Sequence, residues 1–236
     1  MNVIFKTKTK QQLNLLGYYL FRRKFFYIKK KFLYRDFYCN QIGVHRDLPV
    51  TFDDHYGRAK DYLMDVFQRE EGGHLVLDLG CYLAKRLSWF AEQNPHLFFS
   101  GMDLAPMTLE TAKEKTTLPA NVSLVAGDFT HLPFEYRSFD IVFSHLSLYH
   151  VPYHAIEKVL KGICRLSRKD VILVEPFHKV QPLPYNVQLL MSFDKYSHDY
   201  SKLIKQTGFE LKNFVPVYCA SENHYALSIF HLRKKN

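Results

Sequence analysis

The sequence predicts an α/β fold, a doubly wound seven-stranded sheet that is mostly parallel and ends in an antiparallel hairpin. From about residue 50 onward, short apolar runs alternate with segments of helical periodicity, the pattern of βαβ units in a parallel sheet. The last two predicted strands follow each other across a short polar link, which indicates an antiparallel pair at one edge. The composition, 47% hydrophobic and 23% charged, is that of a globular protein and excludes a disordered or collagen-like chain.

The first predicted elements alternate helix and strand. Apolar residues at helical spacing predict a helix over 54–67. A glycine pair then breaks the chain before the apolar run 74–79, which is typical of a buried strand. A helix follows over 83–93 and ends at an Asn-Pro pair, and a second strand covers 97–102. A proline at its first position begins the next helix, 106–115.

The alternation continues with a third strand at 122–125 and a fourth at 140–143, both short and apolar. One apolar face at helical spacing predicts a helix over 153–166, and a fifth strand at 171–174 ends at Glu-Pro.

The end of the sequence changes pattern. A short helix over 200–206 is ended by a glycine, and two successive strands follow at 211–217 and 226–232. These two strands form the predicted hairpin.

Positive charge is concentrated at the start of the chain. Residues 1–46 contain 11 Lys and Arg but a single acid, Asp36, so the remaining residues sum to −1 of the total +9. We therefore expect a basic, aromatic-rich N-terminal helical extension over 1–50 and one domain over 51–236. The extension is predicted to pack on the domain as a lid, or to contact an anionic surface such as a membrane face or a nucleic-acid backbone.

The cysteine positions and the hydropathy of the sequence indicate the cellular compartment of the protein. The four cysteines are scattered without a CxxC pair, which predicts neither a disulfide framework nor a zinc site, and no metal is expected. No stretch approaches the roughly 18 unbroken apolar residues of a spanning helix. We expect a cytoplasmic protein with at most a peripheral contact to a membrane surface through residues 1–46.

Carboxylates stand at the carboxyl ends of four of the five predicted parallel strands. They are Asp78, Asp103, Asp128 and Glu175. Ligands of doubly wound sheets bind beyond these strand ends, where a carboxylate can accept the hydroxyls of a ribose or bind a cationic amine.

These segments resemble motifs of the class I S-adenosylmethionine-dependent methyltransferases of the small-molecule type. The stretch Val76–Gly80 resembles a strand entering D-x-G-x-G-x-G, Ser138–Ser144 resembles the sFDlv.s strand, and Leu148–Val151 resembles the LhHv segment after it. Thr207–Phe209 resembles the turn before the last hairpin. The resemblance covers about residues 54–234 and implies a Rossmann-like fold with S-adenosylmethionine as cofactor.

The resemblance also implies roles for individual residues. Asp103 would hold the ribose hydroxyls, Leu104 would lie against the adenine, Asp128 would meet the adenine amino group and Phe129 would cover the ring. The expected cofactor-binding residues are Asp78, Gly80, Tyr82, Asp103, Leu104, Asp128, Phe129 and Ser144.

The sequence departs from the family at two motif glycines, which are replaced by Tyr82 and Ala84. Those glycines let the backbone approach the methionine part of the cofactor. Three outcomes stay open: Tyr82 turns aside and contacts the cofactor or substrate, it weakens cofactor binding, or it abolishes binding and leaves a non-catalytic binding or scaffold domain. A nicotinamide oxidoreductase is disfavoured because G-x-G-x-x-G would read Gly80, Tyr82, Lys85.

Methyl transfer from a sulfonium needs alignment and desolvation, and it needs a base only where the acceptor keeps its proton at neutral pH. We expect His145 or His150 to act as that base and Tyr149 to orient the acceptor. The alternative is that both histidines serve only packing.

The acceptor itself is predicted only by class. The expected acceptor is a small or lipid-like molecule bound by segments 35–60 and 177–199. A nucleic-acid methyltransferase that grips phosphates with the basic extension is a further alternative, although no N/D-P-P-Y-type segment follows the fourth strand.

Overall fold

The structure is a computed structural model that describes residues 54–176, 198–218 and 226–235. The extension predicted over 1–50 lies outside these residues. The described strands are β1 (Leu75–Leu79), β2 (Phe98–Asp103), β3 (Val122–Ala126), β4 (Phe139–His145), β5 (Ser167–Pro176), β6 (Phe209–Tyr218) and β7 (Ala226–Lys234). The described helices are α2 (Asp54–Gln68), α3 (Lys85–Gln93), α4 (Pro106–Lys115), α5 (Ile156–Leu166), α7 (Tyr200–Ile204) and the 3-10 turn η1 (Leu148–His150).

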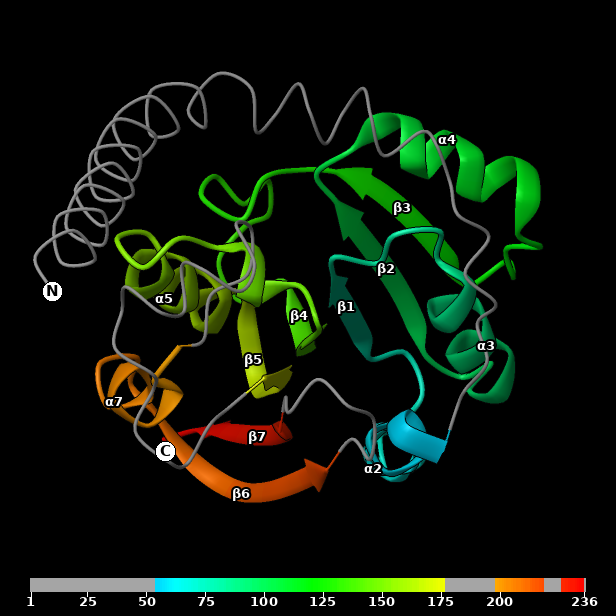
Figure 1. Ribbon diagram of the computed structural model, residues 1–236. Helices are drawn as coiled ribbons and strands as arrows, with labels where there is room; N and C mark the ends of the chain where they lie inside the picture. The colour runs from blue at the N-terminus through cyan, green and yellow to red at the C-terminus, as the bar shows by residue number, and fades with distance from the viewer. Residues whose placement is uncertain (1–53, 177–197, 219–225, 236) are drawn as a thin grey trace, which may run out of the picture. The chain divides into compact units, whose positions relative to one another are not determined.

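The strands form one seven-stranded sheet in the order β3-β2-β1-β4-β5-β7-β6 (Figure 1). Strands β1 to β5 are parallel, and β7 runs antiparallel between β5 and β6. The order reverses at β1 and β4, the switch point beside which doubly wound sheets bind their ligands. The predicted fold class is confirmed, and the terminal hairpin lies at one edge of the sheet with β6 outermost.

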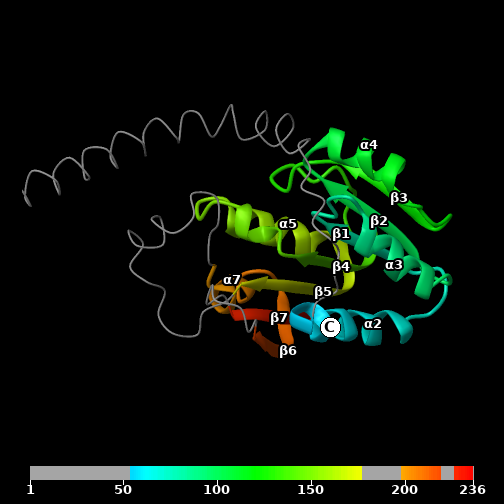
Figure 2. The ribbon, with the colours of Figure 1, turned by 45° about the vertical axis from the view of Figure 1, so that its right-hand side comes forward.

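Two apolar cores lie on the two faces of this sheet. Helices α2, α3 and α4 contribute to one core, and α5 and α7 contribute to the other (Figures 1 and 2). All residues of β4 are buried because that strand has helices on both faces, which is why its sequence is a continuous apolar run. None of the helices in the described ranges has the length and the apolar composition of a membrane-spanning segment.

The element bounds differ from those expected at a few places. The helix expected from residue 83 begins at Lys85, because Ala84 has a left-handed backbone that cannot belong to a helix. The fifth strand extends over Ser167–Pro176 rather than 171–174, since it has partners on both sides, β4 and β7. The turn η1 after β4 was not expected.

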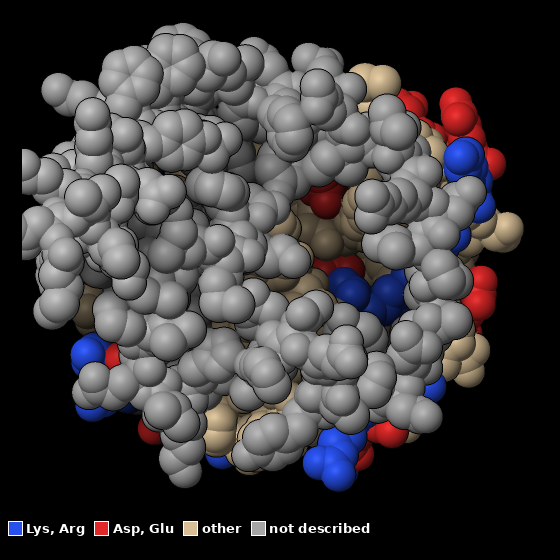
Figure 3. Space-filling model, in the orientation of Figure 1, with Lys and Arg blue, Asp and Glu red and all other residues tan. Residues whose placement is uncertain are grey.

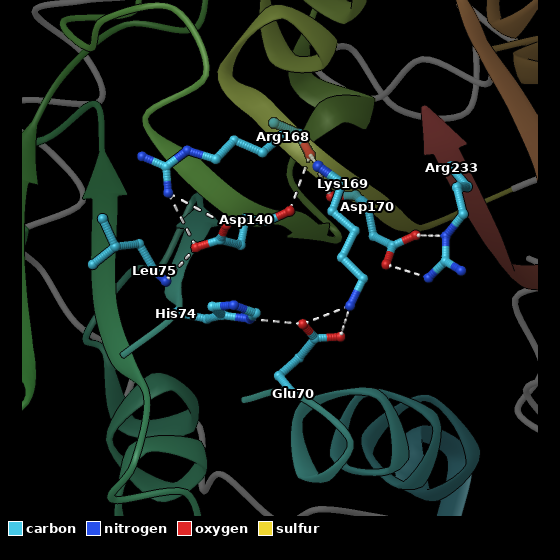
Figure 4. A network of polar contacts seen from close by, with 9 residues as sticks. Glu70, His74, Leu75, Asp140, Arg168, Lys169, Asp170 and Arg233 are labelled. Atoms are coloured by element: carbon cyan, nitrogen blue, oxygen red, sulfur yellow. Dashed lines mark hydrogen bonds and ion pairs between the residues drawn. The ribbon is translucent and has the colours of Figure 1, made fainter. Parts of the chain in front are cut away.

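A polar network ties the amino ends of β1, β4 and β5 to the end of α2 (Figure 4). Glu70 accepts hydrogen bonds from Lys169 Nζ at 2.6 and 2.8 Å and lies 2.9 Å from His74 Nδ1. Asp140 accepts the backbone N–H of Leu75 at 2.9 Å. These residues lie at the end of the strands opposite the predicted motifs, so the network supports the sheet and leaves its carboxyl end for chemistry.

Candidate active site

The turn from β1 into α3 has a left-handed backbone at three alternate residues. Gly80, Tyr82 and Ala84 have φ values of 82°, 51° and 54°, all in the left-handed region. Only the first of them is glycine, and a left-handed conformation costs other residues about 1–2 kcal/mol each. The Tyr82 side chain is 38% exposed, so its phenol is not buried in the core.

Gly80 is required by a close approach of the loop after β4. A Cβ on Gly80 would overlap the Cβ of Ser147, closer than real Cβ contacts come. Ser147 Oγ donates to the carbonyl of Leu79 at 2.6 Å. The Gly80 N–H donates to the carbonyl of Met102 at 2.7 Å. The motif loop is therefore held from β2 on one side and from the β4 loop on the other.

Asp103 stands at the end of β2, beside the motif loop. Its Oδ2 accepts the backbone N–H of Tyr82 at 3.0 Å, and its Oδ1 accepts the N–H of Ala105 at 3.1 Å. Burial raises the pKa of Asp103, and the backbone N–H groups of Ala105 and Tyr82 oppose that rise. Each carboxylate oxygen can accept a second hydrogen bond, so the group can still receive two hydroxyls of a ligand.

Asp78, in β1, is fully buried, and neither of its carboxylate oxygens has a hydrogen-bond partner in the described part of the chain. Burial raises its pKa to about 6, and the charge of Arg86 opposes the rise. Arg86 Nη2 lies 3.6 Å from Asp78 Oδ2. A buried carboxylate with unused acceptor positions is costly unless a ligand satisfies it.

Arg86 also contacts His145, at the end of β4. A guanidinium only donates hydrogen bonds, so Nδ1 of His145 is the acceptor and its proton lies on Nε2. Burial and the neighbouring Arg86 charge both lower the pKa of His145 well below its usual value. The imidazole is neutral, and the lone pair that a base would use faces Arg86.

The loop after β4 is organised around the buried carboxylate of Glu175, at the end of β5. Its Oε1 accepts Ser144 Oγ at 2.5 Å and the backbone N–H groups of Ser147 and Leu148 at 3.1 and 3.0 Å. Burial raises the pKa of Glu175 to about 7, against these hydrogen bonds. Ser144, expected at the cofactor, is thus buried and bonded to Glu175.

The aromatic residues of the same loop lie together in η1. The rings of Tyr149 and His150 are 4.1 Å apart between centroids, and both side chains are half-buried. His198 Nε2 lies 3.2 Å from the carbonyl of Leu148, and burial lowers the pKa of His198 to about 4. The structure therefore places His145 at the end of β4 and Tyr149 and His150 in the turn that follows it, and the base and orienting roles remain predictions.

The residues expected at the adenine lie on the neighbouring strand ends. Leu104 and Phe129 are half-buried, and Phe129 Cζ lies 3.6 Å from the point where a Cβ on Gly80 would lie. Asp128 is exposed, and its Oδ1 accepts Thr130 N–H at 2.7 Å. Its contact with adenine also remains a prediction.

Acidic and basic side chains lie close together near the centre of the face that Figure 3 shows. In the centre of the space-filling view, red and blue atoms lie side by side deep in this face, over the region of β1 and β2 (Figure 3). The open acceptor positions of Asp78 and Asp103 fit a ligand with a cationic amine and paired hydroxyls, as S-adenosylmethionine has. The expected acceptor segment 177–199 lies mostly outside the described residues.

Sequence reasoning missed Arg86 and Ser147. Two basic residues in the first turn of a helix without an acid are an unfavourable pattern, and this signal points to Arg86. Nothing in the sequence pattern marks Ser147, since its role depends on the approach of two distant loops.

Comparisons with known proteins show what the chain is similar to in sequence and in fold. Residues 76–170 match a family model described as a methyltransferase domain. A demethylmenaquinone methyltransferase of Staphylococcus haemolyticus is 32% identical over 126 residues, which is 53% of this chain and 51% of that protein. The chain thus spans about half the length of the curated relatives it matches.

Solved structures share the fold at low sequence identity. Magnesium protoporphyrin IX methyltransferase of Synechocystis PCC 6803, solved with bound SAH, superimposes with a TM-score of 0.63 at 18% identity, over 87% of this chain and 100% of that one. A geranyl diphosphate methyltransferase in complex with GPP and sinefungin gives a TM-score of 0.62 at 12% identity, over 76% of this chain and 78% of that one. At such identities the likeness establishes the fold.

Proposed function

Because the chain contains a class I S-adenosylmethionine-dependent methyltransferase domain, we propose that it transfers a methyl group from S-adenosylmethionine to a small, lipid-like molecule. The observation that carries this proposal is the pair of carboxylates Asp78 and Asp103 on either side of a left-handed motif loop. Asp78 has no hydrogen-bond partner among the described residues, and each oxygen of Asp103 can accept a second hydrogen bond. The two residues lie on adjacent parallel strands, of which β1 is at the switch point of the sheet.

In this proposal each residue contacts a different part of the cofactor. Asp103 accepts the ribose hydroxyls while its other lone pairs hold the backbone of Tyr82 and Ala105. Asp78 faces the α-ammonium group, and Leu104 and Phe129 contact the adenine. The cofactor supplies an electrophilic methyl group, so the chain contributes alignment of the acceptor and exclusion of water. His150, with Tyr149 against its ring, is the better placed base, since His145 faces Arg86.

Two observations support a small apolar acceptor. The relative from Staphylococcus haemolyticus is named for demethylmenaquinone, a small lipid-like molecule. The η1 loop offers aromatic rings rather than charges to an acceptor. The basic extension, residues 1–46, would bring the domain to an anionic membrane surface where such molecules dissolve.

Calorimetric titration with S-adenosylmethionine and S-adenosylhomocysteine tests the cofactor site. We expect micromolar binding to the natural chain and a loss of roughly 10–100-fold in Asp103→Asn, since hydrogen bonds to a charged group contribute about 1.5–3 kcal/mol. The matched control is Glu110→Gln, an exposed carboxylate on α4 that pairs with Lys113. A folded natural chain that binds neither compound would reject the proposal.

Turnover is a separate test. Transfer of a radiolabelled methyl group to a membrane lipid extract, lost in Asp103→Asn and kept in Glu110→Gln, is the expected result. Binding without transfer to lipid extracts or to nucleic acid would instead favour a non-catalytic binding domain.

A further inference from the structure

The amino end of α3 lacks the capping side chain and the acidic residues that usually stabilise the start of a helix. Its N-cap, Ala84, makes no side-chain capping bond, and its first turn contains no acid. The first two residues are Lys85 and Arg86, at the end of the helix that carries partial positive charge. Basic residues there destabilise the free helix and favour a bound anion. A helix start that lacks a cap and carries unfavourable charges is expected where those residues serve a function.

A second observation points to a ligand at the same place. Asp78 is fully buried, and both of its oxygens lack hydrogen-bond partners in the described ranges. The guanidinium of Arg86, whose side chain is 23% exposed, comes within 3.6 Å of it, and its Nε also has no partner there. The pair therefore brings one negative and one positive group together, each with unused hydrogen-bonding capacity.

We propose that Arg86 recognises the α-carboxylate of the cofactor's amino-acid group while Asp78 receives the α-ammonium, so that the two side chains bind a zwitterion. This inference rests on the proposed function and adds a specificity-determining residue to it. An α-amino acid carries its two charges on one carbon, which matches two opposite charges held side by side. The planar fork of arginine suits a carboxylate, and the helix end adds its dipole to the same charge.

A structural role and a recognition role for Arg86 predict different ligand preferences. If Arg86 only compensates Asp78, its loss harms every adenosine ligand alike, because the motif loop itself is disturbed. If Arg86 binds the carboxylate, its loss harms only ligands that contain one. The discriminating measurement is therefore a comparison of ligands, made on the full chain.

The probes are S-adenosylhomocysteine, its decarboxylated analogue and 5′-methylthioadenosine, titrated calorimetrically. In Arg86→Gln we expect S-adenosylhomocysteine to bind roughly 10–100-fold more weakly, and the other two to change less than about threefold. The matched control is Lys113→Gln, which removes an exposed charge on α4 that pairs with Glu110, and it should change all three affinities less than about threefold.

Each other outcome overturns the inference. Equal losses for the three ligands in Arg86→Gln show a structural role, and an unchanged affinity for S-adenosylhomocysteine shows no role. A natural chain that binds methylthioadenosine, but binds S-adenosylhomocysteine no more tightly than its decarboxylated analogue, refutes only the carboxylate contact. A natural chain that binds none of the three refutes the proposed function as well.

Circular dichroism checks that the variants fold. If Arg86→Gln does not fold, Arg86→Lys keeps the charge and removes the fork. The same selective loss for S-adenosylhomocysteine, of smaller size, is then expected, and a uniform loss overturns the inference.

Discussion

At the scale of single residues, the turn after β1 has a left-handed backbone even at residues that are not glycine. Three residues adopt left-handed angles although only Gly80 does so without cost. The N–H of Tyr82 is fixed by Asp103, and the neighbouring Gly80 is fixed by Met102. The surrounding contacts thus impose on Tyr82 a conformation that its own side chain disfavours.

Replacing Tyr82 with glycine should therefore stabilise the fold. We expect Tyr82→Gly to raise the free energy of unfolding by about 0.5–1 kcal/mol, the left-handed strain less the entropy cost of glycine. Urea denaturation measures it. The control is Arg137→Gly, an exposed residue with φ 55° outside the site, which should gain a similar amount. A loss of stability specific to Tyr82→Gly would show that the phenol makes a stabilising contact.

Residues differ in how well the sequence predicts them. Asp103 could be placed because the end of a parallel strand fixes its position, and the structure puts it beside the motif loop. Arg86 could not, because the direction of a long side chain depends on what packs around it. Its contact with His145 joins residues 59 positions apart, which no local pattern encodes.

At the scale of elements, the site is assembled where two loops touch. The motif loop after β1 and the loop after β4 meet at Gly80 and Ser147, with no space for a side chain between them. Element types and most element bounds follow from apolar periodicity, because strands covered on both faces have continuous apolar sequences. The contact between the loops does not follow, since it depends on a fit of tenths of an ångström.

Adding one methyl group at this contact should disrupt the site. We expect Gly80→Ala to lower the free energy of unfolding by roughly 2–4 kcal/mol, through steric overlap with Ser147 and a left-handed alanine. Gly57→Ala is the matched control, because that glycine lies within α2 with open space around it and should gain about 1 kcal/mol. Partial rescue of Gly80→Ala by Ser147→Gly would identify the overlap as the cause, and equal effects of the two alanines would contradict it.

Glu175, which holds the loop after β4, predicts that the stability of the fold depends on pH. Burial raises the pKa of Glu175 to about 7 in the folded protein, from 4.5. The stability linked to this group is therefore complete below pH 4.5 and is lost as the pH rises through 7. Relative to Glu175→Gln, the natural chain should lose roughly 2 kcal/mol between about pH 5 and pH 8.

Chemical denaturation at several pH values measures this difference. The control is Glu157→Gln, an exposed carboxylate on α5 paired with Lys161, which should give a difference that does not vary with pH. A flat profile for Glu175→Gln as well would mean that Glu175 keeps an ordinary pKa.

At the scale of the whole molecule, charge is unevenly distributed along the chain. Residues 1–46 carry +10 and the remainder −1. The polar network at the amino ends of β1, β4 and β5 pairs its charges internally, which leaves the basic extension as the main source of net charge. Long-range attraction to an anionic surface would therefore come from the extension.

Vesicle sedimentation tests this role on the full chain. Changing Lys29, Lys30 and Lys31 to glutamine should weaken binding to phosphatidylserine vesicles roughly 10–100-fold, at about 1 kcal/mol per lysine near the surface. The control removes the same charge from the domain by changing Lys113, Lys158 and Lys161 to glutamine. Equal effects of the two triple variants, or binding to neutral vesicles that is just as strong, would argue against a membrane role for the extension.

The place of β7 in the sheet has a consequence for synthesis. Among the described strands, β6 pairs only with β7, and β7 also supplies the second neighbour of β5. A ribosome that has completed β6 has therefore released a strand with no partner and a β5 whose edge is still open. Until β7 emerges, both edges can pair with a neighbouring nascent chain, so a pause in translation before residue 226 is the moment of greatest risk of aggregation.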